Sequence, residues 1–306
     1  MLSADGRLDE WCLAGVGSVP VETFFAAQSM SQVRGVVLAD GRRVALKLRE
    51  ASDRVVACAD AHRAARAAGI DCPELLAGPQ QLTDGGWLSA EEWRPDGSPV
   101  APGDAAAGYA ALLHDLVAAL AGFEPALFDP PPPWAHYDHR AEGRVWPPAA
   151  SAGWDPESQV VPPGLRRLAA AARERLLAEE LPLVVGHSDL NGLNVRWAPQ
   201  PIVHDWDSLA GRPECVLAGI LAVNHVELPG AGQITTIADT DRTLELYQES
   251  RPFSQSETEV AWAAGIWVAA YNAAFEHLHG SAGQVSTQLQ ADGAQRLRRA
   301  GCSQVI

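Results

Sequence analysis

Three short apolar runs between residues 181 and 209 constrain the fold more than any other feature of this sequence. A polar loop separates the first run from the second, and a proline-containing turn separates the second from the third. Runs of this length between turn residues are typical of short strands; they are residues 183–185, 195–197 and 202–204. These strands carry the polar loop and the acidic end of the third run to the same edge. The side chains expected to gather there are Asp189, Asn194, Asp205 and Asp207.

Carboxylates at this density need a counter-charge, because several of them cannot stay ionised side by side without one. Carboxylate and amide oxygens suit Mg²⁺, which usually takes a couple of protein ligands and completes its shell with water and phosphate oxygens. A carboxylate outside the metal shell is then free to accept a proton from an attacking hydroxyl group. Positioning, metal charge and one base are what phosphoryl transfer needs, so this stretch indicates that reaction.

The first ninety residues read as a small strand-rich unit. Two β runs flank Asp40-Gly41, a dipeptide favoured in tight hairpins, and Lys47 lies in the second run. An Ala- and Arg-rich stretch follows, which predicts a helix that ends at Gly69. The expected elements are residues 21–27, 33–38, 44–48, 51–68 and 87–93. The pattern breaks at residues 94–97, which predicts a boundary between an N-terminal lobe (1–93) and a C-terminal lobe (94–306).

The second lobe reads as mostly helical. The predicted helices are residues 105–122, 165–180, 214–223, 240–250 and 257–279. Between the first two, residues 125–163 hold ten of the 22 prolines and three of the ten tryptophans. Such a proline density prevents a long regular element, so this segment is either an ordered lid or an extended surface connection.

The composition excludes several classes of function. Asp and Glu (38) outnumber Lys and Arg (23), and the net charge of −15 disfavours binding to nucleic acid or to anionic membranes. Such a surface suits a cationic small molecule, or simply keeps the chain soluble. No apolar signal segment opens the sequence, and its most apolar stretch, 261–275, is too short to span a membrane. Five scattered cysteines argue against a disulfide framework, so a reducing cytoplasm is expected.

Two motifs in this chain resemble those of protein kinases. H-S-D-L-N-G-L-N (187–194) resembles the catalytic loop of the protein-kinase-like superfamily, and H-D-W-D (204–207) looks like its metal-binding motif. The short hairpin between them, without an activation segment, is similar to the aminoglycoside phosphotransferase family of small-molecule kinases. The resemblance runs from Gln28 to the last predicted helix. It implies an α+β, bilobal protein-kinase-like fold with a small antiparallel-sheet N-lobe and a larger helical C-lobe.

The resemblance implies a role for each residue of the two motifs. Asp189 would be the base, or orienter, for the acceptor hydroxyl group. Asn194 and Asp205 would hold Mg²⁺ on the ATP phosphates, and His187 would brace the loop rather than act in catalysis. Lys47, in the run V-A-L-K-L, matches the strand lysine that grips the α- and β-phosphates.

The resemblance adds residues that would bind the nucleotide: Ser29, Ser31, Asp60, Glu91 and Trp93. The two serines lie where a hairpin should cover the phosphates, and the last two residues lie where a linker hydrogen-bonds adenine. The helix after Lys47 should supply a glutamate partner for this lysine, at a position near Cys58, and no glutamate lies there. Asp60 is the nearest carboxylate and is the expected substitute.

Three further residues are candidates for the acceptor site. Asp207 would contact the substrate, bind a second metal ion, or cap the helix that follows it. Asn272 and Glu276 share one face of a predicted helix at a spacing of i, i+4. They would either meet an amine of the substrate or form an ordinary solvated face.

Together these features predict an enzyme that moves the γ-phosphoryl group of ATP or GTP to a hydroxyl group of a small molecule, with Mg²⁺. The acidic composition and the family favour a cationic aminoglycoside or amino sugar, and with it antibiotic resistance. A macrolide, a peptide antibiotic, choline or homoserine are the alternative acceptors. Two other classes stay open. One is a nucleotide-binding pseudokinase, and the other is a metallohydrolase using His187, Asp189, His204, Asp205 and Asp207.

Overall fold

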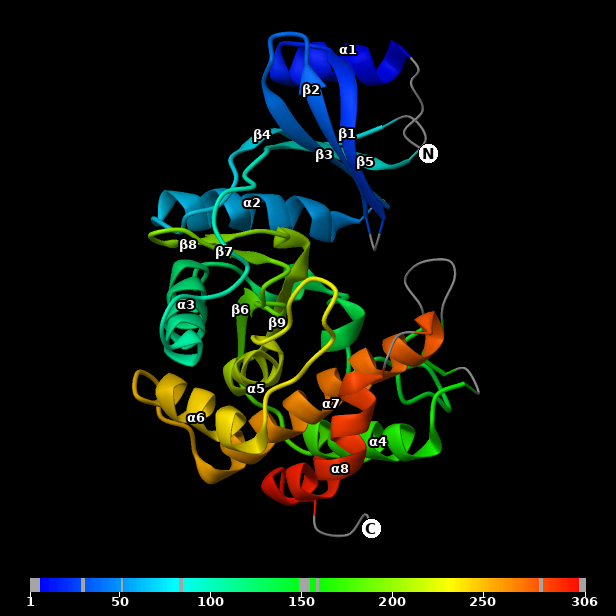
Figure 1. Cartoon of the computed structure of the whole chain (residues 1–306), viewed down its shortest axis with the longest axis vertical. Helices are drawn as coiled ribbons and strands as arrows, with labels where there is room; N and C mark the ends of the chain where they lie inside the picture. Colours follow the sequence, from blue (N-terminus) through cyan, green and yellow to red (C-terminus); the bar gives the residue numbers. More distant parts are fainter. Residues whose placement is uncertain are drawn as a thin grey trace.

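The computed structural model describes residues 6–28, 31–50, 52–82, 85–148, 155–157, 160–280 and 283–302. Its N-terminal part is a five-stranded antiparallel sheet with the strand order β1-β2-β3-β5-β4 (Figure 1). The strands are β1 (Pro20–Gln28), β2 (Gln32–Leu38), β3 (Arg43–Arg49), β4 (Leu75–Gln81) and β5 (Trp87–Glu92). Helix α1 (Gly6–Val16) lies above the sheet in Figure 1, and α2 (Asp53–Ala67) lies below it.

The side chains of β3 alternate between the two faces of the sheet, and the two faces contact different parts of the protein. Val44 and Leu46 are fully buried in a cluster that includes Trp11 of α1. Because successive side chains of a strand point to opposite faces, Lys47 and Arg49 point away from the α1 layer. They lie on the face that α2 covers, where a small cavity is lined by Arg49 and by residues of α2. The two faces therefore divide into an apolar one and a charged one.

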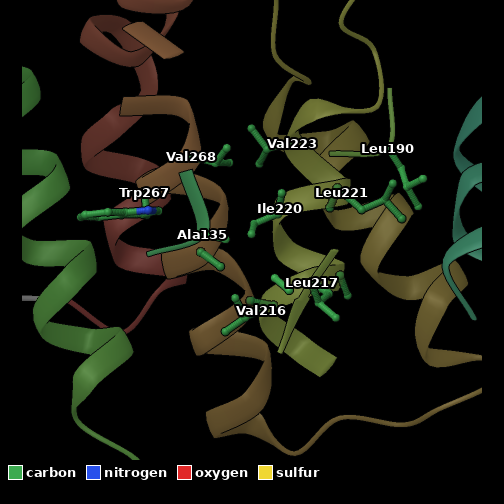
Figure 2. Close-up of a cluster of buried hydrophobic side chains, with 14 of the residues drawn as sticks. Ala135, Leu190, Val216, Leu217, Ile220, Leu221, Val223, Trp267 and Val268 are labelled. Atoms are coloured by element: carbon green, nitrogen blue, oxygen red, sulfur yellow. The ribbon is translucent and has the colours of Figure 1, made fainter. Parts of the chain in front are cut away.

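The C-terminal part packs its helices around α5 (Glu214–Asn224) and α7 (Gln255–His279). Their side chains interdigitate in the main core, as Figure 2 shows for Ile220, Val223 and Val268. The remaining helices of this part are α3 (Ala105–Ala119), α4 (Pro163–Leu177), α6 (Ile237–Gln248) and α8 (Gln284–Arg299). The fold is thus bilobal and protein-kinase-like, with a small antiparallel sheet and a larger helical region.

Helix α7 begins where the sequence supplies a capping box. The Ser254 hydroxyl group accepts a hydrogen bond from the Glu257 N–H (3.1 Å), and the Glu257 carboxylate accepts one from the Ser254 N–H (2.8 Å). Two of the helix's first N–H groups are satisfied in this way. Gly280 ends the helix in a left-handed conformation (φ 66°), which glycine adopts without steric cost. Local signals therefore fix both ends of the longest described helix.

Two short antiparallel pairs connect the helical region to the sheet. Strand β6 (Leu183–His187) pairs with β9 (Leu209–Pro213), and β7 (Val195–Trp197) pairs with β8 (Pro201–Val203). The β7–β8 hairpin lies directly beneath α2 in Figure 1. The apolar runs of the sequence thus form the strands they predict, and β9 is an additional strand that pairs with the first of them.

The described parts of the Pro- and Trp-rich segment are ordered and packed against the helical region. It contains two short 3₁₀ helices, η1 (Pro125–Phe128) and η2 (Pro133–Ala135). Phe128, Ala135 and Trp146 are fully buried in the main core. Trp154, the third tryptophan of the segment, lies outside the described residues. At least residues 125–148 are therefore packed on the core and are not an extended surface connection; a role as a lid stays a prediction.

Helices α1 and α8 and strands β4 and β9 are absent from the elements expected from the sequence. Helix α8 is polar along most of its length and reads as a tail, but its Arg296 is fully buried and donates to the Thr235 carbonyl group (2.5 Å). The division of the chain after residue 93 stays a prediction. Within the described ranges, no helix is both long and apolar enough to cross a membrane.

Candidate active site

Lys47 forms a buried ion pair with Glu91 on the charged face of the sheet. Antiparallel pairing of β3 with β5 puts the two side chains on the same face, with Lys47 Nζ 3.0 Å from Glu91 Oε2. The same Nζ lies 4.0 Å from Asp205 Oδ1. Burial alone would lower the pKa of Lys47, but the carboxylates of Glu91, Asp205 and Asp207 outweigh it and raise that pKa. Lys47 is therefore a fixed positive charge beside Asp205.

This pairing corrects two expectations. Asp60 is not the partner of Lys47, because it lies on the exposed side of α2 and pairs with Arg63 (Nη1–Oδ1 2.9 Å). Glu91 lies inside β5 rather than in a linker, and its carboxylate pairs with Lys47; a hydrogen bond from its backbone to adenine stays a prediction. The carboxylate partner of Lys47 is therefore Glu91 on the neighbouring strand β5, and not a residue of α2.

Arg49 brings a second positive charge to the same face. Its Nε donates to Asp207 Oδ2 (2.6 Å), its Nη1 donates to Ser89 Oγ (2.7 Å), and its Nη2 lies 3.7 Å from Glu91 Oε1. Burial would raise the pKa of Asp207, but Arg49 and then Lys47 outweigh it and lower that pKa. Asp207 is thus held in an internal ion pair with Arg49, and its three expected roles, in substrate contact, in binding a second metal ion or in capping a helix, stay predictions.

The β7–β8 hairpin brings Asn194 and Asp205 together. Asn194 immediately precedes β7, and its backbone carbonyl accepts a hydrogen bond from the His204 N–H, just after β8 (2.7 Å). Because β7 and β8 are antiparallel, the residue before β7 lies next to the residues that follow β8, at one edge of the hairpin. The local fold therefore delivers both expected metal ligands to one place.

Asp205 has a left-handed backbone conformation (φ 54°, ψ 58°), the one non-glycine residue with positive φ among the described residues. Such a conformation costs about 1–3 kcal/mol and persists where the surroundings hold it. Ser208 supplies that hold: its N–H donates to the Asp205 carbonyl (2.9 Å) and its Oγ donates to Asp205 Oδ2 (3.0 Å). The other carboxylate oxygen faces Lys47. The strained backbone of Asp205 is therefore kept because it directs the carboxylate toward Ser208 and Lys47.

Asp189 lies in the loop between β6 and β7, and two asparagines fix its carboxylate. Asn191 Nδ2 donates to Oδ1 (2.9 Å), and Asn194 Nδ2 donates to Oδ2 (2.7 Å). Burial, then Glu227 and Asp205, raise the pKa of Asp189 well above its ordinary value. A carboxylate in this environment takes up a proton more readily than an exposed one.

His187 joins the two motifs as a neutral side chain. The Asp189 N–H donates to His187 Nδ1 (3.2 Å), so the ring hydrogen is on Nε2, which lies 3.0 Å from the His204 carbonyl. Burial lowers the pKa of His187, although the charge of Asp205 opposes this. With both ring nitrogens engaged in the loops, the geometry agrees with the bracing role expected for this histidine.

Glu227 belongs to the site, and the sequence analysis misses it. Its Oε2 lies 3.3 Å from Asn191 Nδ2, and its backbone carbonyl accepts a hydrogen bond from the Gly192 N–H (2.9 Å). Burial, then the charge of Glu276, raise the pKa of Glu227 to about 7. No motif surrounds Glu227 in the sequence. Arg49, also missed, has a signal: it follows Lys47 by two positions on a strand and so shares its face.

Ser29, Ser31 and Trp93 are the remaining residues expected to bind the nucleotide. Ser29 lies outside the described residues, whereas Ser31 is half-buried and immediately precedes β2. Trp93 packs against Phe24 and Phe25, with ring centroids 4.9 and 5.4 Å away.

Asn272 Nδ2 donates to Asn224 Oδ1 (3.2 Å). Glu276 is buried, and its carboxylate accepts hydrogen bonds from the backbone N–H groups of Val285 and Ser286 at the start of α8 (3.2 Å each). The alternative that Glu276 belongs to an ordinary solvated helix face is therefore wrong. Contact of either residue with a substrate stays a prediction.

The metallohydrolase alternative finds no support in this geometry. No group of three or more His, Cys, Asp or Glu side chains in the described part of the chain could hold a metal ion. His187 is engaged on both sides, as described above. A magnesium–nucleotide site needs fewer protein ligands, because phosphate oxygens and water complete the shell. Asn194 and Asp205 meet that smaller requirement.

The family comparison identifies the class of protein that this fold and site define. Residues 27–227 match the model of the phosphotransferase enzyme family. Because the match covers more than half of the chain, the chain belongs to this family, and the expectation of a phosphotransferase is confirmed. No curated protein matches the sequence.

Solved structures of small-molecule kinases share the fold at low sequence identity. An amicoumacin kinase in complex with AMP-PNP, Ca²⁺ and Ami has a TM-score of 0.62 and 13% identity over 92% of this chain and 89% of its own. A spectinomycin phosphotransferase with ADP and spectinomycin has a TM-score of 0.57 and 10% identity, covering 97% and 94%. An aminoglycoside phosphotransferase from Alicyclobacillus acidocaldarius has a TM-score of 0.53 and 17% identity, covering 95% of each chain. At these identities the likeness concerns the fold.

Proposed function

We propose that this protein is an ATP- or GTP-dependent O-phosphotransferase that transfers the γ-phosphoryl group to a hydroxyl group of a small molecule. The observation that carries the proposal is the convergence of Lys47, Asn194 and Asp205 beside the Asp189 loop. Lys47 Nζ lies 4.0 Å from Asp205 Oδ1, and Asn194 donates to the Asp189 carboxylate. A cation, two oxygen ligands and a base thus meet at one edge, which is the set that phosphoryl transfer uses.

Mg²⁺ fits the donor set of this edge. The Asn194 amide nitrogen is used by Asp189, which leaves its amide oxygen as the ligand atom, and the Asp205 carboxylate is about one-third exposed. Asn194 and Asp205 would hold the ion, and hard oxygen ligands of this type suit it. The ion would neutralise charge on the nucleotide phosphates. Lys47 would bind the α- and β-phosphates, with Glu91 fixing its direction.

Asp189 would serve the acceptor. In the transfer, the acceptor oxygen forms a bond to the γ-phosphorus while the bond from phosphorus to the β–γ bridging oxygen breaks. The hydroxyl proton passes to the Asp189 carboxylate, and the nucleoside diphosphate leaves. Asn191 and Asn194 orient that carboxylate through the two hydrogen bonds described above.

For the acceptor, a cationic amino sugar or aminoglycoside is the class we propose, with antibiotic resistance as the biological role. The net charge of −15 and Glu227, a half-buried acid beside the Asp189 loop, support it. Two of the structural neighbours named above are, by their names, a spectinomycin phosphotransferase and an aminoglycoside phosphotransferase, which supports the same class. Residues 1–93 would form the nucleotide-binding lobe. All five cysteines are free and four of them are buried, which agrees with a reducing cytoplasm.

Asp189→Asn tests the proposal, with Asp60→Asn as the matched control. Nucleotide consumption is measured against a panel of aminoglycosides, amino sugars, macrolides, peptide antibiotics and amino alcohols. The wild type should consume ATP or GTP with at least one acceptor class, and Asp60→Asn should match it because Asp60 is exposed. Asp189→Asn should lose at least 10²-fold in rate while still binding nucleotide. Unchanged activity of Asp189→Asn would refute the assignment, and nucleotide binding without turnover on any acceptor would indicate a pseudokinase.

A further inference from the structure

Trp134, in the Pro- and Trp-rich segment, contacts the catalytic loop directly. It lies in η2, and its Nε1–H donates to Oγ of Ser188, the residue just before Asp189 (3.1 Å). Its backbone carbonyl accepts a hydrogen bond from Nε1 of Trp267, a fully buried residue of α7 (2.8 Å). Figure 2 shows Trp267 on α7 near Ala135, the neighbour of Trp134. Trp134 is therefore held by α7 on one side and reaches the loop on the other.

The hydrogen bonds continue from Ser188 to Asp205. Ser188 Oγ donates its single hydrogen to the backbone carbonyl of Ser208 (2.7 Å), and Ser208 Oγ donates to Asp205 Oδ2 (3.0 Å). The direction of the chain is fixed, because an indole N–H only donates and a carbonyl only accepts. Both serines are buried. A fully satisfied network at low dielectric is rigid, so the position of one end constrains the other.

We propose that Trp134 is a positioning residue for the Asp205 carboxylate and acts through Ser188 and Ser208. The inference rests on the proposed function, in which Asp205 binds the metal ion of the metal–nucleotide complex. The left-handed backbone of Asp205 needs outside support, and Ser208 makes two hydrogen bonds to this residue. Trp134 fixes the Ser188 hydroxyl group, which holds the Ser208 carbonyl together with the Ser188 N–H (2.9 Å). The Pro- and Trp-rich segment is thus linked to the expected metal ligand Asp205 through two serines.

Trp134→Phe tests this role, because it removes the donor nitrogen and keeps an aromatic ring. Trp146→Phe is the matched control. Trp146 belongs to the same segment and is fully buried, and its Nε1 has no hydrogen-bond partner within the described ranges. The affinity of the full chain for AMP-PNP is measured by calorimetry, once with Mg²⁺ and once with EDTA. The melting temperature of each variant is recorded without ligand.

Loss of one hydrogen bond predicts that Trp134→Phe weakens the affinity for AMP-PNP with Mg²⁺ by about two- to tenfold. Its affinity in EDTA should match that of the wild type, and Trp146→Phe should match it in both conditions. Ser188→Ala should reproduce the loss, and adding Trp134→Phe to it should have no further effect, because both act on one chain of hydrogen bonds.

Three results would overturn the inference: equal metal dependence in the wild type and Trp134→Phe, equal losses in the two tryptophan variants, or additive losses in the double variant. A different result would overturn the proposed function and this inference with it, namely a wild type that binds AMP-PNP equally with Mg²⁺ and with EDTA. The behaviour of the wild type therefore separates the two failures. Should Ser188→Ala not fold, the comparison of Trp134→Phe with Trp146→Phe still decides.

Discussion

Neutralising Glu91 is the sharpest test of how this protein holds its nucleotide-binding lysine. The gross attraction between Lys47 and Glu91 at 3.0 Å is about 5.5 kcal/mol for an effective dielectric constant of about 20. Desolvation offsets much of it, and removing one partner of a buried pair typically costs about 3–5 kcal/mol. Because Gln keeps a hydrogen bond, Glu91→Gln should lower the free energy of unfolding by about 3 kcal/mol. The melting temperature should fall by roughly 6–12 °C.

The same substitution should weaken nucleotide binding. Without Glu91, Lys47 must be ordered again when the nucleotide binds, and fixing a lysine side chain costs about 1.5–2 kcal/mol. That predicts about 10- to 30-fold weaker binding of the nucleotide. Stability is measured by urea unfolding and affinity by calorimetry, with Asp60→Asn as control, since Asp60 pairs with Arg63 at the surface. The reasoning would be refuted if Glu91→Gln bound the nucleotide with wild-type affinity and Asp60→Asn bound it more weakly. Asp60 of α2 would then be the carboxylate that holds Lys47.

Further predictions concern pH and packing. The pKa of Glu227 is raised to about 7 from 4.5, so the folded state binds more protons than the unfolded state between these values, and stability should fall as pH rises through this window. The decline attributable to Glu227 should be up to about 3 kcal/mol, and urea unfolding of Glu227→Gln across that window should show a flatter profile. A Cβ at Gly219 would overlap the backbone carbonyl of Ala261, so Gly219→Ala should destabilise the α5–α7 crossing by about 3 kcal/mol. Gly164→Ala, whose Cβ meets no atom within 4 Å, should be neutral or stabilise the protein by about 0.5–1 kcal/mol; calorimetric melting of the two variants compares them, and equal effects would contradict the packing argument.

The sequence determines those parts of the site that depend on neighbours in the chain. Asn194 and Asp205 meet because a tight hairpin joins them, and short apolar runs separated by turn residues encode that hairpin. Lys47 faces the site because a strand alternates its side chains. The capping box at Ser254 and Glu257 sets the start of α7 in the same local way. For these residues, composition and spacing are sufficient.

Only the tertiary structure decides the partners. Lys47 pairs with Glu91 because β5 enters the sheet beside β3, and no local pattern records which strands become neighbours. Trp134 reaches Ser188 because α7 holds η2 against the loop. Contacts of this kind join residues far apart in the chain, and they form where packing of the whole core, rather than local propensity, sets the minimum of free energy.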